Sequence, residues 1–145
     1  MKIFFAGDHA GFELKKDLME YVKSLGYEVE DLGPFSYNAG DDYPDYVTPL
    51  ANRVVETGFG IIIGGSGQGE AMCANRVKSV RAAVYYSGDI DVVKKAREHN
   101  DANILSLGAR FVSKEDAKAA VKFFLETPFS GDERHIRRIK EIDFV

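Results

Sequence analysis

"GIIIGGSGQGE", residues 60–70, joins a short apolar run to a loop rich in glycine. Ile61–Ile63 is apolar on both faces, which is typical of a strand inside a parallel sheet that helices cover on both sides. Four glycines then fall within residues 64–69, so the loop offers bare backbone amides to an anion. The Lys-Ser or Lys-Thr pair of a nucleotide-binding P-loop does not follow it. This stretch predicts a buried strand with an anion-binding loop at its end.

Around this stretch, short β-rich runs alternate with longer helical patterns. The sequence predicts strands at residues 2–6, 27–32, 60–64, 81–86 and 102–108. It predicts helices at about residues 11–24, 45–57, 67–77, 89–98, 114–126 and 133–141. Regular alternation with continuous apolar strands indicates an α/β fold of three layers, with a five-stranded parallel sheet flanked by helices. The length of 145 residues, with no linker or repeat, fits one domain.

Composition and charge exclude several classes of protein. The chain has 45% hydrophobic and 29% charged residues, the balance of a globular protein in water. No apolar stretch approaches the roughly 20 residues of a membrane-spanning helix, and the apolar run at the N-terminus is too short for a signal peptide. The net charge of -4 gives a nucleic-acid partner no general attraction. Cys73 is the single cysteine, so an internal disulfide and a cysteine-built metal site are excluded. We expect a cytoplasmic protein with neither a membrane nor a nucleic-acid partner.

The order of the predicted elements groups the polar residues into two sets. Ligands of parallel sheets bind at the carboxyl ends of the strands, and four candidates follow the first and third strands: Asp8, His9, Ser66 and Glu70. His99 and Asn100 instead precede the last strand. They therefore belong at the opposite edge of the sheet, and would need a second subunit to meet the others.

Five motifs in this order resemble one known family. They are GDHAGFELK (7–15), DYPDY (42–46), GGSGQGE (64–70) followed by ANR (74–76), REHNDAN (97–103) and ERHIRR (133–138). Together they are similar to the ribose-5-phosphate isomerases of the B type, in the family that also holds the galactose-6-phosphate isomerase subunits. The resemblance implies a Rossmann-like fold and a homodimer with shared active sites, or a tetramer of such dimers. It also implies the interconversion of an aldose phosphate and its ketose without a metal or any other cofactor.

The resemblance points to Glu70 as the catalytic base. Aldose–ketose isomerisation moves a proton between C2 and C1, so one base must reach both carbons. Many relatives carry a cysteine immediately before the glycine run, where this chain has Gly64. A second branch of the family has GSGxGE and uses the glutamate. A glutamate in a first helical turn is also favoured by the helix dipole alone, which lowers its pKa unless burial offsets this effect. We expect Cys73 to be a small core residue.

The glycine loop is interpreted as a cradle for the enediolate oxygens, because backbone amides stabilise an oxyanion without taking the proton themselves. Its members are Gly65, Ser66, Gly67, Gln68 and Gly69. On the loop alone, a phosphate-binding turn of another sugar-phosphate or nucleotide protein is an equal interpretation.

The resemblance also supplies the remaining substrate contacts. His99 matches the histidine that opens the sugar ring, and Asn100 matches a substrate-binding amide. Without the resemblance, both residues would equally well end a helix, with Asn100 as the cap. The family's phosphate ligands match His9, Arg110, Arg134 and Arg138.

Some residues of these motifs also allow a purely structural interpretation. Asp8 and Tyr43 match contacts to the sugar hydroxyls, whereas Asp45 is equally suited to cap a helix. The arginines near the C-terminus also suit a solvated helix face, an interpretation that fits Arg137 and Lys140 best.

These observations favour a ribose-5-phosphate isomerase. Isomerisation of a six-carbon sugar phosphate, galactose 6-phosphate or allose 6-phosphate, differs only in the pocket length it needs. A binding module without catalysis is the alternative from another class, but such a module has no need of a carbon base.

Overall fold

The computed structural model describes residues 1–145 and contains one parallel sheet of five strands. The strand order is β2-β1-β3-β5-β4. The strands are β1 (Lys2–Gly7), β2 (Glu28–Asp31), β3 (Phe59–Gly64), β4 (Ala82–Tyr85) and β5 (Ile104–Gly108). A 3-10 turn, η1 (His9–Gly11), precedes the helices α1 (Phe12–Ser24), α2 (Pro44–Glu56), α3 (Gln68–Ala74), α4 (Asp91–Asn100), α5 (Lys114–Glu126) and α6 (Glu133–Asp143).

The central strand is the apolar run of residues 60–64. β3 pairs in parallel with both β1 and β5, and Ile61, Ile62 and Ile63 are fully buried. The prediction of a strand buried on both faces is therefore confirmed.

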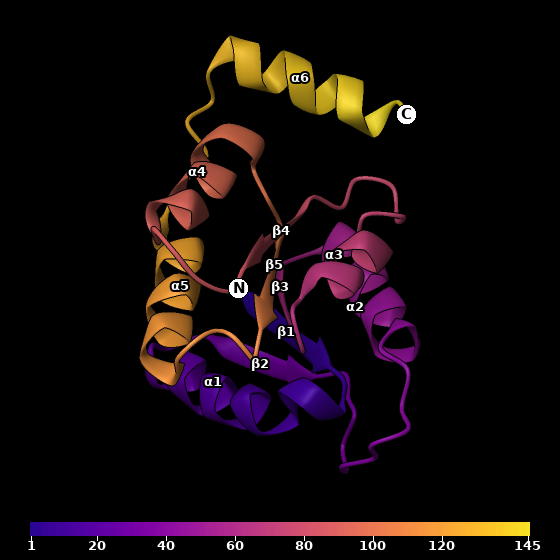
Figure 1. Cartoon of the computed structure of the whole chain (residues 1–145). Helices are drawn as coiled ribbons and strands as arrows, with labels where there is room; N and C mark the ends of the chain where they lie inside the picture. The colour runs from indigo at the N-terminus through magenta and orange to yellow at the C-terminus, as the bar shows by residue number, and fades with distance from the viewer.

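Helices cover both faces of the sheet, which confirms the three-layer prediction (Figure 1). α1, α4 and α5 lie on one face, where Leu18, Val93 and Phe124 pack on side chains of the central strands. α2 and α3 lie on the other face, where Leu50 and Ala74 pack on strand side chains such as Ile62. Alternate residues of β1 and β3 serve the two cores, as the period of two in a strand requires.

The last helix stands apart from these layers. Figure 1 shows α6 beyond one end of the sheet, next to α4. His135 is its one buried residue, so most of the surface of α6 lacks a partner within the chain.

The ends of some elements differ from the predictions. The predicted strand 27–32 shortens to β2, and the predicted helix 67–77 ends at Ala74. Asp45 is not a helix cap, because Tyr43 is the N-cap of α2 and Pro44 is its first residue. A proline with its fixed φ suits the first helical position, so the helix begins at Pro44, one residue earlier than predicted. The helices of the structure are too short or too polar to span a membrane.

Candidate active site

A pocket of about 350 Å³ lies where β1, β3 and β5 end. Nine residues line it: Asp8, His9, Ala10, Tyr43, Gly65, Ser66, Gly69, Glu70 and Arg110. The predicted meeting of the groups that follow strands one and three is thus confirmed. Arg110 joins them from the end of the last strand.

Glu70 lies in this pocket because the loop leads into α3 and because Gly64 has no side chain. It lies in the first turn of α3 and is only 4% exposed. Its carboxylate occupies the space beside Gly64, where any Cβ would overlap Oε1 and the carboxyl carbon. Glycine at position 64 is therefore what allows the glutamate to reach the end of β3.

The surroundings of Glu70 favour its neutral form. Burial raises the pKa of its carboxyl group above the usual value, a hydrogen bond from its own backbone N–H opposes this, and the Asp8 carboxylate raises the pKa further. No basic side chain contributes to the shift of its pKa. Desolvation thus outweighs the effect of the backbone hydrogen bond, and the pKa moves in the direction that favours a general base.

The glycine loop keeps several amides free. Gly67 adopts φ 79°, in the left-handed region that favours glycine, and its carbonyl accepts a 2.6 Å hydrogen bond from Ser106 Oγ. The backbone N–H groups of Gly65, Ser66 and Gly67 donate to no acceptor of the chain. Ser66 Oγ accepts from the amide of Gln68 at 3.3 Å. The hydrogen bond from Ser106 thus fixes the loop through the Gly67 carbonyl, while the three N–H groups stay available as donors.

Two close approaches fix the width of the pocket. A Cβ on Gly69 would overlap the hydroxyl of Tyr43, and a Cβ on Gly65 would lie 3.1 Å from Arg110 Nη1. The absence of a side chain at these two glycines therefore allows Tyr43 and Arg110 to approach the loop backbone closely. Gln68 is exposed and does not line the pocket, and its amide already donates to Ser66 Oγ, so it offers no free donor there.

His9 is oriented by a carboxylate that the sequence did not indicate. Asp41 Oδ1 lies 2.8 Å from His9 Nδ1 and accepts from the His9 backbone amide at 3.1 Å. The Asp41 side chain is 3% exposed, and its Oδ2 is buried without a partner. Asp8 is buried too, and its Oδ1 accepts from the Ala10 amide at 2.9 Å. Asp41 lies in a loop with no helical or strand periodicity, so no pattern could have paired it with His9.

The same three side chains are the one cluster that could offer ligands to a metal ion. Possible ligand atoms of Asp8, His9 and Asp41 lie within 4.8 Å of one another. His9 Nδ1 and Asp41 Oδ1 already bind each other, however. The arrangement therefore resembles an oriented histidine more than a preformed cation site.

The remaining predicted residues do not line this pocket. His99 and Asn100 end α4, immediately before β5, and thus lie at the opposite edge of the sheet. Asn100 does not cap the helix, because Asp101 does so with φ 44°. Asn100 instead lines a second pocket of about 320 Å³, together with Asn75 and Arg81.

Arg134 and Arg138, the predicted phosphate ligands on α6, are exposed, and Arg134 lies 3.8 Å from Asp132. Cys73 is half-buried against the second core and lies 3.4 Å from Thr48 Oγ1. It is therefore less deeply buried than a core residue, and it does not line the pocket of Glu70.

Known proteins resemble this chain over nearly its whole length. The crystal structure of ribose-5-phosphate isomerase B from Mycoplasma genitalium with bound ribulose-5-phosphate superposes with a TM-score of 0.93 at 41% identity, covering 99% of this chain and 94% of that one. The enzyme structure from Thermotoga maritima gives a TM-score of 0.92 at 44% identity, covering 99% and 98%. Ribose-5-phosphate isomerase B of Mycobacterium tuberculosis H37Rv is 40% identical over 141 residues, 96% of this chain and 86% of that protein. The sequence signature of the Ribose/Galactose Isomerase family matches residues 3–142, and the chain belongs to this family.

Proposed function

We propose that the chain interconverts ribose 5-phosphate and ribulose 5-phosphate through an enediolate, with Glu70 as the base. The observation that carries the proposal is the buried carboxylate of Glu70 beside three free backbone amides. The Mycoplasma genitalium relative, which binds ribulose-5-phosphate, supports the choice of substrate.

Glu70 moves the proton between the two carbons. In its ionised form it takes the proton from C2 of the open aldose and returns it to C1, giving the ketose. Its raised pKa makes it a stronger base than an exposed glutamate. Both carbons lie next to each other in the substrate, so one carboxylate oxygen can serve them in turn.

The glycine loop stabilises the charge that this transfer creates. The N–H groups of residues 65–67 have no acceptor in the chain and are the proposed donors to the enediolate oxygens. Preorganised donors of this kind contribute about 10²-fold to 10³-fold in rate. Asp8 and Tyr43 line the same pocket and bind the sugar hydroxyls.

Arg110 and His9 line the same pocket and are the proposed phosphate contacts of this chain. With Nδ1 held by Asp41, the imidazolium form of His9 keeps its Nε2–H for a phosphate oxygen. The planar guanidinium of Arg110 suits the same group. Arg134 and Arg138 add to this charge from the partner subunit.

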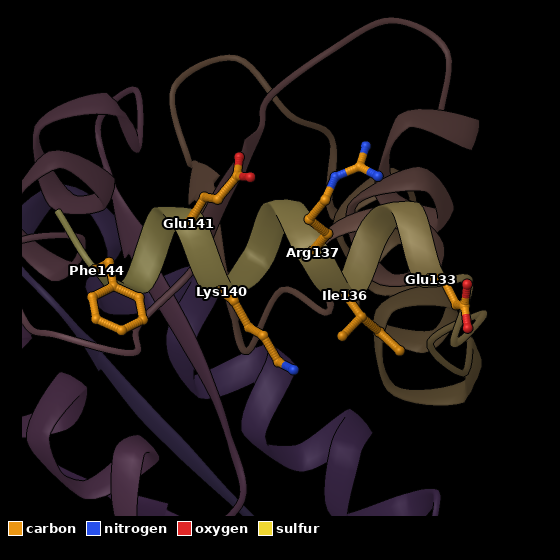
Figure 2. A pocket seen from close by; sticks show the side chains of 6 residues that line it. All are labelled: Glu133, Ile136, Arg137, Lys140, Glu141 and Phe144. Atoms are coloured by element: carbon orange, nitrogen blue, oxygen red, sulfur yellow. The ribbon is translucent and has the colours of Figure 1, made fainter.

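The functional unit in this proposal is a homodimer. His99, Asn100, Arg134 and Arg138 then act on the pocket of the partner. α6 supports this arrangement, because its outer face forms an open groove of about 700 Å³ with no covering from its own chain. Figure 2 shows Ile136, Lys140 and Phe144 on one side of the helix, and Phe144 is 88% exposed.

One assay tests the reaction directly. Purified protein is mixed separately with ribose 5-phosphate, galactose 6-phosphate and allose 6-phosphate, and ketose formation is followed. We expect the highest kcat/KM with ribose 5-phosphate. A faster reaction with either six-carbon substrate would contradict the substrate assignment, and no reaction with any would contradict the enzyme assignment.

A further inference from the structure

Two contacts fasten α6 to the segment that carries His99 and Asn100. At its far end, Asp143 accepts a 3.3 Å hydrogen bond from Arg81 Nη1. The same Arg81 donates from Nε to the carbonyl of Asn100 at 2.9 Å. One guanidinium thus links the end of α6 with the end of α4.

The second contact is a stack of two imidazole rings. The ring centroids of His99 and His135 are 4.5 Å apart and the rings are inclined by only 16°. His135 is 6% exposed, and its Nε2 is buried without a hydrogen-bond partner. A buried polar nitrogen without a partner is unfavourable, so packing alone does not account for a histidine at this position.

We propose that His135 is a positioning residue for His99. Its ring covers one face of the His99 imidazole and fixes the direction in which the nitrogens of His99 meet the sugar ring. The inference rests on the proposed function, in which His99 opens the furanose. It adds a residue that makes no contact with the substrate and acts through the orientation of its neighbour.

The charge state of His135 suits this role. Burial lowers the pKa of His135, and neighbouring positive charge on His99, Arg134 and Arg138 lowers it further, while Asp132 opposes this. A neutral His135 can stack on His99 in both protonation states of His99. His99 can therefore gain and lose a proton during ring opening without repulsion between two imidazolium rings.

A purely structural role would have a different signature. If His135 only held α6 in place, its removal would also disturb the phosphate contacts of Arg134 and Arg138, and every reaction of the substrate would slow alike. If it positions His99, only the step that needs His99 should slow. The two substrates separate these cases, because ribose 5-phosphate rests as a furanose whereas ribulose 5-phosphate, with its O5 phosphorylated, is open.

The experiment compares two reactions of the same variants. The first is turnover of ribose 5-phosphate, which includes ring opening. The second is exchange of the C1 hydrogen of ribulose 5-phosphate with deuterium from D₂O, followed by NMR. This exchange requires proton removal and return at C1 but no ring opening.

The variants are His135→Ala, His135→Leu and His135→Phe, with Lys95→Ala on the exposed surface of α4 as a control. We expect His135→Ala and His135→Leu to lower kcat for ribose 5-phosphate by about 10-fold or more. This is the order of effect that a misplaced catalytic group produces. Deuterium exchange should stay at the wild-type rate. The variant His135→Phe keeps a flat ring against His99 and should retain most of the turnover. The control Lys95→Ala should change neither reaction.

Three results would overturn the inference. An equal fall in turnover and exchange would assign His135 to the structure alone, and full turnover in both Ala and Leu would leave it without a role. Phe behaving like Leu would exclude stacking as the cause. A wild-type protein that neither turns over ribose 5-phosphate nor exchanges hydrogen at C1 would instead contradict the proposed function, on which the inference depends. Sedimentation of each variant keeps loss of the dimer apart from these outcomes.

Discussion

The pocket of Glu70 and the end of α4 with α6 are built in opposite ways. The first is formed by strand ends and glycines, and Glu70, the proposed base, is 4% exposed. The second consists of a helix end and a helix that stands off the body, and its arginines lie in solvent. Proton transfer needs a fixed, desolvated group, and Glu70, buried in the first turn of α3 at the end of the central strand, meets this need. In the proposed function, ring opening and part of the phosphate binding fall to this second surface, which would become a site only against another subunit.

The largest expected effect tests the first region. Glu70→Gln should keep the fold but lower kcat about 10²-fold or more, because general-base catalysis is removed. Cys73→Ser, outside the pocket, is the control and should lose little activity, and thiol alkylation should not inactivate the enzyme at its active site. An inactive Cys73→Ser beside an active Glu70→Gln would contradict the assignment of the base.

A second variant tests how tightly this region is built. Gly64→Ala introduces a Cβ that would overlap the Glu70 carboxylate. Because either the base or the loop must move, kcat should fall about 10-fold to 100-fold, with a smaller change in KM. A crystal structure of the variant should show Glu70 displaced. Normal turnover would mean that the position of the carboxylate is not critical.

The third prediction asks whether the two regions meet across subunits. Glu70→Gln and His99→Asn proteins, each nearly inactive alone, are unfolded together and refolded as mixed dimers. Half of a random mixture is heterodimer, and each heterodimer has one intact site, so about a quarter of wild-type activity should return. A mixture no more active than its parents, with heterodimers shown to be present, would place His99 at the pocket of its own chain.

The smallest effect concerns stability and pH. The pKa of Glu70 is raised in the folded chain, so ionisation of this group opposes folding. This penalty is absent below the ordinary carboxyl pKa of 4.5, grows as the pH rises through the raised pKa, and is complete above it. Glu70→Gln should therefore melt at a higher temperature than wild type at neutral pH and at a similar temperature below pH 4.5. Equal melting at both pH values would argue against desolvation of Glu70.

Local patterns predicted the first region better than the second. Ile61–Ile63 and the glycines after it define a strand and a loop within a few residues, so the position of Glu70 followed from sequence order. The pairing of His9 with Asp41 and the stack of His99 on His135 join residues that are far apart in the chain. No periodicity reports such pairs, because they depend on how loops and helices pack. Asp45 shows the same limit on a small scale, since the preference of Pro44 for the first helical position displaced the cap.

The space shared by Gly64 and Glu70 limits how Glu70, the proposed base, could be exchanged for another during evolution. A side chain at position 64 and a carboxylate from position 70 would occupy the same volume, so a cysteine at position 64, which the family resemblance leads us to expect in many relatives, and the glutamate of this chain exclude each other. A change at position 64 alone crowds the glutamate, and a change at position 70 alone leaves no base. A lineage passing from one catalyst to the other must therefore alter both positions together or survive an inactive intermediate. Two solutions to one reaction can in this way persist side by side in a single fold.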